Sequence, residues 1–108
     1  MTDRMKKLLS FEENDPKDPF IQFAIAKEYE KTDQTYDALA KYLSLQSEHP
    51  DYMGLYYHLA KLYEVLNEKE KAIKIYDQGL ELAKKTKDFH AASELNNAKM
   101  NLEMDLDD

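Results

Sequence analysis

A seven-residue pattern that recurs after 34 residues constrains the fold of this chain more than any other feature. Residues 23–29 and 57–63 align without a gap at this offset, and the alignment extends into the segments that follow them. The paired positions agree in size and polarity: Ile25 with Leu59, Ala26 with Ala60, Tyr29 with Tyr63, Ala38 with Ala72 and Tyr42 with Tyr76. A fixed period of this length indicates stacked repeats, each of which buries its apolar surface against its neighbours.

The amino-acid composition favours helices joined by short turns. The 108 residues include only two glycines and three prolines, and the helix formers Ala, Leu, Lys and Glu are frequent. The prolines separate helices, and Asp33 and Asn67 stand at turns, where their side chains tolerate a left-handed backbone. We expect helices over about residues 3–14, 19–31, 35–48, 52–66, 69–85 and 88–104.

The period and the order of large, small and aromatic residues resemble the tetratricopeptide repeat, a helix-turn-helix unit of 34 residues. The resemblance implies an all-α fold, a superhelix of antiparallel helix pairs with about six helices. It divides the chain into an N-terminal half-repeat helix (1–16), two repeats (17–50 and 51–86), a capping helix (87–104) and an acidic tail (105–108). Phe89, Ala92, Leu95 and Leu102 are expected on the inward stripe of the capping helix, with a polar face opposite.

Register with the family pattern separates core tyrosines from the others. Tyr29, Tyr42, Tyr56, Tyr63 and Tyr76 fall at signature positions and are expected in the core. Gln22 departs from the pattern, because the family has a large aromatic residue there, and Lys84 replaces its proline.

In the family, peptides bind in a concave groove lined by the first helix of each repeat, and the resemblance carries that site onto seven residues of this chain. The implied peptide-binding groove contains Phe20, Phe23, Lys27, Lys31, Tyr57, His58 and Lys61. Aromatic side chains in such a groove act as anchors, and the equivalent Lys27 and Lys61 can meet a carboxylate. The alternative is that these two lysines are merely solvated, since exposed charge pairs contribute little. The lysine and asparagine clamp of the chaperone-binding members is absent as a set.

The charge distribution argues against nucleic acids and membranes as partners. The net charge is −7, and residues 101–108 hold four acidic groups and no basic ones, whereas phosphate binding needs a basic stripe. No stretch approaches the roughly 18 apolar residues of a membrane span, and the apolar run near the N-terminus meets Glu12 and Glu13 too soon for a signal peptide. A cytoplasmic location is therefore expected.

The sequence offers no catalytic or metal-binding constellation. There is no cysteine, and His49, His58 and His90 lie far apart without a helical pair. No nucleophile, base and orienting group converge. We therefore expect neither an enzyme nor a cofactor, and no catalytic or metal residues.

These observations favour a non-enzymatic adaptor that binds a peptide segment of another protein in the groove. The alternative is a structural module that forms a homodimer through the half repeat at residues 1–16 or through exposed aromatic surface. The alternative arises because two full repeats are fewer than the three that usually make such an array stable.

Overall fold

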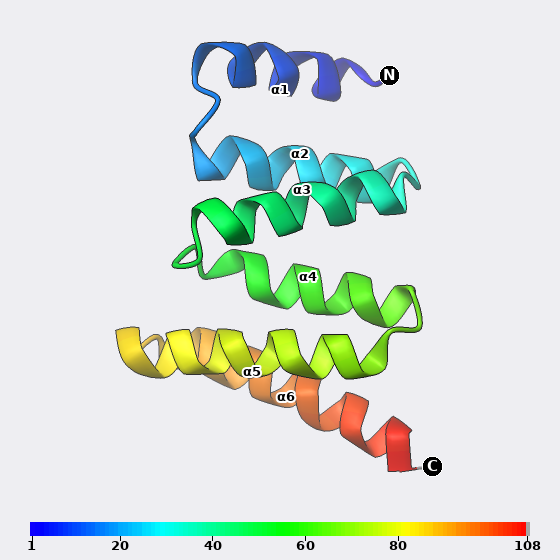
Figure 1. The fold of residues 1–108 in the computed structure, drawn as a ribbon, viewed down its shortest axis with the longest axis vertical. Helices are drawn as coiled ribbons and strands as arrows, with labels where there is room; N and C mark the ends of the chain where they lie inside the picture. Colours follow the sequence, from blue (N-terminus) through cyan, green and yellow to red (C-terminus); the bar gives the residue numbers. More distant parts are fainter. Residues whose placement is uncertain (108) are drawn as a thin grey trace. The chain divides into compact units, whose positions relative to one another are not determined.

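The computed structural model describes residues 1–107, without the side chain of Asp107, as six helices with no strand (Figure 1). The predicted all-α fold is confirmed. The chain divides into two compact units, residues 1–52 and the part that begins at Met53. None of the helices within residues 1–107 combines the length and the apolar character that a membrane span requires.

The first unit contains α1 (Asp3–Asn14), α2 (Pro19–Lys31) and α3 (Thr35–Glu48), with the bounds that the sequence predicts. α2 starts where Asp18 caps it: the Phe20 amide donates to Asp18 Oδ1 at 2.9 Å, and proline occupies the first helical position. The short turn after α2 makes α2 and α3 an antiparallel pair, and α1 packs against α2.

Apolar side chains of all three helices form the core of this unit. α1 contributes Met5 and Leu8, which cluster with Ile25 of α2. Ala26 and Ala38 are fully buried, as expected for small residues where helices approach closely. The half-repeat helix thus covers α2 within its own chain.

Gln22 stands where the repeat pattern has a large aromatic residue, and its side chain takes part in a hydrogen-bond network. Gln22 is 7% exposed, and its Nε2 donates to Glu12 Oε2 at 3.0 Å and to the Pro16 carbonyl at 2.9 Å. The same Glu12 oxygen accepts from Lys41 Nζ at 2.6 Å. This network ties α1, α2 and α3 together, and it satisfies the buried amide.

The second unit contains α4 (Gly54–Val65), α5 (Lys69–Thr86) and α6 (Phe89–Asp107), in which α5 packs against both α4 and α6. α4 begins two residues later than predicted, because the backbone amide of Tyr52 donates to the carbonyl of His49 at 3.0 Å and Tyr52 therefore belongs to the preceding turn. Tyr56, Leu59, Ala60, Ala72 and Tyr76 are buried.

Three helices end in the same left-handed turn. Asp33, Asn67 and Lys87 have φ of 60°, 59° and 59°. In each case the next amide reaches back across the turn: Gln34 to the Tyr29 carbonyl at 2.8 Å, Glu68 to Tyr63 at 2.8 Å and Asp88 to Ala83 at 2.9 Å. This is the Schellman pattern of helix termination. The expectation for Asp33 and Asn67 is confirmed, and Lys87 is a third site that the sequence did not indicate.

α6 differs from the predicted capping helix at both ends and on its outer face. Asp88 is its cap, since the Ala91 amide donates to Asp88 Oδ1 at 3.0 Å. The helix continues through the acidic tail to Asp107, because no proline or glycine stops it; Asp108 lies outside the described residues. Leu95 and Leu102 are buried as predicted.

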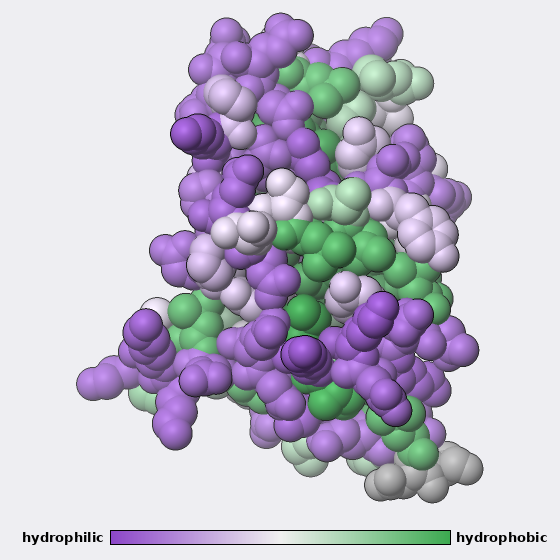
Figure 2. Space-filling view, in the orientation of Figure 1, coloured by the Kyte–Doolittle hydropathy of each residue, from purple (hydrophilic) through white to green (hydrophobic). Residues whose placement is uncertain are grey.

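The predicted inward position of Phe89 is wrong, and the predicted polar face of α6 also exposes apolar side chains. Phe89 is 79% exposed because it lies at the first turn, on the side opposite to Leu95 and Leu102. Met100 and Met104 are 51% and 63% exposed and share that outer side, three and four turns further along. Hydrophobic patches among hydrophilic side chains are visible on the face shown in Figure 2.

The expected core tyrosines divide into two groups. Tyr42, Tyr56 and Tyr76 are buried, whereas Tyr29 and Tyr63 are only half-buried. The last two lie in the final turns of α2 and α4.

Candidate peptide-binding site

Phe23 and Lys27 form an aromatic and cationic pair on α2. They are one turn apart, so they share a helix face, and Lys27 Nζ lies 5.4 Å from the centre of the Phe23 ring. The ring itself is half-buried, with the Tyr52 ring at 5.3 Å and the Tyr42 ring at 6.1 Å. Phe23 is therefore held in place on its inner side while the exposed Lys27 covers its face.

Tyr57 and Lys61 form the equivalent pair on α4. Lys61 Nζ lies 5.7 Å from the centre of the Tyr57 ring, and the His58 ring meets the Tyr57 ring edge-on at 5.6 Å. Lys61 also forms an ion pair with Glu64 at 3.8 Å. The repeat thus places the same pair of chemical groups at the same position in both units.

A tyrosine of the second helix in each repeat supports the turn that follows each pair. Tyr42 donates its hydroxyl hydrogen bond to Glu30 Oε1, and Tyr76 donates to Glu64 Oε2. Burial raises the pKa of both tyrosines well above the ordinary value, and the neighbouring carboxylate raises it further. Both hydroxyls therefore remain protonated donors at neutral pH, and they fix the two glutamates next to the lysines.

The first unit contains a hollow of about 350 Å³ between α1 and α2. Four of the predicted groove residues line it together, namely Phe20, Phe23, Lys27 and Lys31. The other three, Tyr57, His58 and Lys61, lie on α4 in the second unit. Phe20 is 68% exposed at the start of α2, where it offers most of its ring to solvent.

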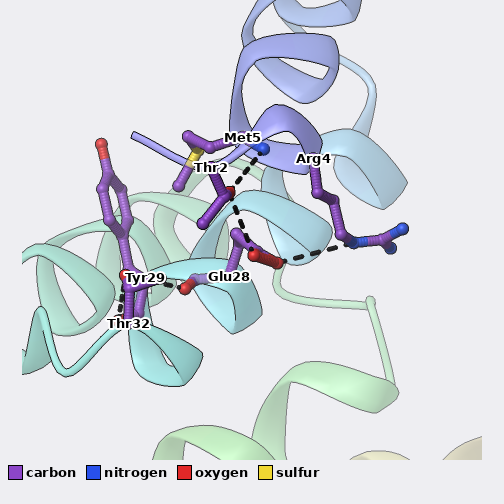
Figure 3. A network of polar contacts seen from close by, with 6 residues as sticks. All are labelled: Thr2, Arg4, Met5, Glu28, Tyr29 and Thr32. Atoms are coloured by element: carbon purple, nitrogen blue, oxygen red, sulfur yellow. Dashed lines mark hydrogen bonds and ion pairs between the residues drawn. The ribbon is translucent and has the colours of Figure 1, made fainter.

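Sequence reasoning missed two residues of this hollow, Arg4 and Glu28. Glu28 is only 5% exposed and points from α2 toward the first turn of α1 (Figure 3). Its carboxylate accepts from Thr2 Oγ1 at 3.3 Å and pairs with Arg4 Nε at 3.6 Å. Thr2 also caps α1 by accepting from the Met5 amide at 3.0 Å, so one hydroxyl links the two helices.

The offset of 34 contains the signal that could have revealed these two residues. It aligns Arg4 with the buried Ala38 and Glu28 with the buried Leu62. Two opposite charges that replace two apolar core residues of the repeat indicate a pair of groups in contact, because an unpaired buried charge is costly.

Two solved structures that resemble this chain are of tetratricopeptide repeat domain proteins. The crystal structure of a tetratricopeptide repeat domain protein from Salinibacter ruber is 44% identical, with a TM-score of 0.76 over 80% of this chain and 96% of that one. A solution NMR structure of a tetratricopeptide repeat domain protein from the same organism is 45% identical, with a TM-score of 0.79 over 82% and 90% of the two chains. The solution structure of a protein from Bordetella parapertussis reaches a TM-score of 0.84 at 19% identity, over 97% and 91%, and shows the fold alone. No protein-family model and no curated protein matches this sequence.

Proposed function

The chain belongs to the tetratricopeptide repeat family, and from this membership we propose that it is a non-enzymatic adaptor that binds a peptide segment of another protein through the aromatic and lysine pair of its repeats. Helical repeats of this family are interaction modules, which typically serve as scaffolds and not as catalysts. A protein or peptide is therefore the partner, and no cofactor is part of the proposal. A cytoplasmic location stays a prediction.

One observation carries the proposal: the aromatic and lysine pair recurs at equivalent positions outside the core. Phe23 with Lys27 and Tyr57 with Lys61 have the same spacing and nearly the same separation. Packing of the repeat accounts for buried residues such as Ile25 and Leu59, but it does not require a lysine over a half-buried ring. Aromatic rings and adjacent charges are the groups that most often dominate binding at protein interfaces.

Selection from a phage library of short random peptides tests this proposal. The wild-type chain is expected to enrich a family of peptides, and Phe23→Ala with Tyr57→Ala is expected to lose them while the far-UV circular dichroism stays unchanged. Tyr36→Ala is the matched control, because Tyr36 is an aromatic residue on α3 that is 75% exposed and belongs to neither pair.

Two results would count against the proposal. One is undiminished binding by the Phe23→Ala and Tyr57→Ala double variant, and the other is a failure of the folded wild-type chain to enrich any peptide. If the alanine variant unfolds, Phe23→Leu with Tyr57→Leu keeps most of the apolar volume and removes the aromatic rings and the Tyr57 hydroxyl, so the comparison can still be made.

Self-association is a second candidate function, favoured by the outer face of α6. Phe89, Met100 and Met104 expose most of their side chains on one side of this helix, and exposed apolar patches mark interaction surfaces. Light scattering over a concentration series is expected to show a mass that rises with concentration and that returns to the monomer in Phe89→Ser with Met100→Gln. A constant monomer mass excludes this candidate.

A further inference from the structure

The hollow between α1 and α2 carries an uncompensated positive charge. Arg4, Lys27 and Lys31 line it, and Glu28 is the one carboxylate among its lining residues. Glu28 is already held by Arg4 and by the hydroxyl of Thr2. Within residues 1–52, neither Lys27 nor Lys31 forms an ion pair. Two lysine charges therefore remain available in a chain whose net charge is −7.

Comparison at the offset of 34 shows that the repeat does not require all of these charges. Lys31 corresponds to Val65 of the second repeat, and Arg4 corresponds to Ala38 of the first. Lys61 corresponds to Lys27, but Glu64 pairs with it at 3.8 Å. The second repeat thus packs with no counterpart of Lys31 and with its counterpart of Lys27 already paired, so packing does not explain two free lysine charges in the first unit.

The walls of the hollow beside these lysines are apolar. The exposed Phe20 and the half-buried Phe23 both line the hollow. The volume of about 350 Å³ lies within the usual range of ligand pockets. Charged groups next to an apolar wall select a ligand with both features, because an acidic group gains charge-assisted hydrogen bonds while an apolar neighbour covers the rings.

We propose that this hollow binds a partner segment in which an aspartate or glutamate side chain lies next to a large apolar residue. The carboxylate contacts Lys27 and Lys31, and the apolar residue packs on Phe20 and Phe23. The inference rests on the proposed peptide-binding function and gives it a ligand class. Charge complementarity with the two unpaired lysines is the argument for an acidic segment.

The composition of the enriched peptides tests the ligand class separately from peptide binding itself. Random peptides displayed within a loop of the carrier protein have no free carboxyl end, so any acidic group that is selected must be a side chain. We expect the enriched sequences to place Asp or Glu beside Leu, Ile, Phe or Met. Enriched sequences that are neutral or basic would disprove the acidic ligand class and leave the proposed function intact. A failure to enrich any peptide would contradict both the ligand class and the proposed function.

A charge-matched pair of variants then locates the binding site. Lys27→Gln with Lys31→Gln is expected to weaken binding of an enriched acidic peptide by about tenfold or more, since it removes both charge-assisted contacts. Lys6→Gln with Lys7→Gln removes the same charge from exposed lysines of α1 that do not line the hollow, and it is expected to change binding less than about twofold. Equal losses in both variants would mean that only the overall charge matters, and the hollow would then not be the site.

A second copy of the chain is the competing occupant, because residues 101–108 are acidic. Light scattering distinguishes the two occupants. A monomer mass in the wild-type chain supports an external segment, whereas a concentration-dependent mass that Lys27→Gln with Lys31→Gln abolishes would assign the hollow to the acidic end of another copy and overturn the proposal.

Discussion

The hydroxyl of Tyr42 donates a hydrogen bond to the carboxylate of Glu30, from the second helix of the first repeat to the end of its first helix. The same bond recurs between Tyr76 and Glu64, 34 residues later. Each tyrosine ring is fully buried, and each glutamate lies one turn beyond the lysine of the aromatic pair. The core of each repeat thus determines where a carboxylate stands on the surface that is proposed to bind a peptide.

Removal of either hydroxyl is expected to destabilise the protein. Tyr42→Phe leaves Glu30 without its hydrogen-bond donor, and hydrogen bonds to charged groups contribute roughly 1.5–3 kcal/mol to stability. Glu30 is partly exposed, so water replaces some of this lost interaction in the variant. We expect a loss of about 1–2 kcal/mol for Tyr42→Phe and a similar loss for Tyr76→Phe, measured by urea unfolding. Tyr36→Phe, at a residue 75% exposed, should change little. Equal stabilities of all three variants would contradict the role assigned to these bonds.

Gly79 is expected to tolerate no side chain. A Cβ atom there would lie 2.7 Å from Tyr56 Cβ and 2.9 Å from Leu95 Cδ1, and the Tyr56 atom is too close to the backbone to move aside. Gly79→Ala should therefore lower the free energy of unfolding by about 1–3 kcal/mol, although alanine favours a helix by about 1 kcal/mol. The thermal midpoint measures this.

Gly54→Ala serves as the control for this substitution. Gly54 is exposed at the start of α4, where alanine gains helix propensity, so a small rise in stability of about 0.4–1 kcal/mol is expected. A stabilised Gly79→Ala variant would show that α4, α5 and α6 can move apart at little cost.

Replacement of Lys87 by glycine is expected to stabilise the protein. Its φ of 59° costs a residue with a Cβ atom about 1 kcal/mol or more, whereas glycine adopts this conformation freely. Lys87→Gly should raise the free energy of unfolding by about 0.5–1 kcal/mol, since Lys84 and Lys85 still provide positive charge at the end of α5. Lys85→Gly, at a helical position, should lower it by about the same amount, and the reverse order in chemical unfolding would exclude strain at Lys87.

The pH dependence of stability should include a contribution from Glu12. The hydrogen bond from Lys41 lowers the pKa of Glu12 below its ordinary value, and the bond from Gln22 adds to this effect. A carboxyl whose pKa is lower in the folded state stabilises the fold above its unfolded pKa of about 4.3, and this stability is lost as the pH falls through the lower folded value. Glu12→Gln should therefore reduce the loss of stability in acid.

Unfolding curves at neutral pH and at progressively more acidic pH measure the contribution of Glu12. Glu13→Gln is the matched control, because Glu13 is the exposed neighbour on the same helix. If Glu12→Gln and wild type lose stability in parallel as the solution is acidified, the network around Gln22 does not depend on the charge of Glu12.

The helices and their order could be predicted because local signals and the repeat agree. The prolines, the cap at Asp18 and the turn residue Asp33 indicate the bounds of the first three helices, and Asn67 marks the turn after α4. The predicted start of α4 is two residues too early, because Tyr52 belongs to the preceding turn. The predicted end of α6 is too early, because the acidic residues that follow position 104 do not end a helix that no proline or glycine interrupts.

The grouping of site residues could be predicted only in part. The repeat placed Phe23 with Lys27 and Tyr57 with Lys61, since spacing along one helix fixes a shared face. It did not place Arg4 beside them, because that contact depends on how α1 packs against α2.

By itself, the sequence determined the repeat, the helical class and the residues that recur with the period, because these depend on spacing along the chain. Only the tertiary structure decided that Glu28 is buried against Arg4, that Phe89 faces outward, and that Lys27 and Lys31 share one hollow with Arg4. The physical reason is the same in each case, because the environment of a side chain depends on which helix packs against the helix that carries it. A periodic sequence pattern does not predict this contact when the sequence of the packing helix departs from the repeat.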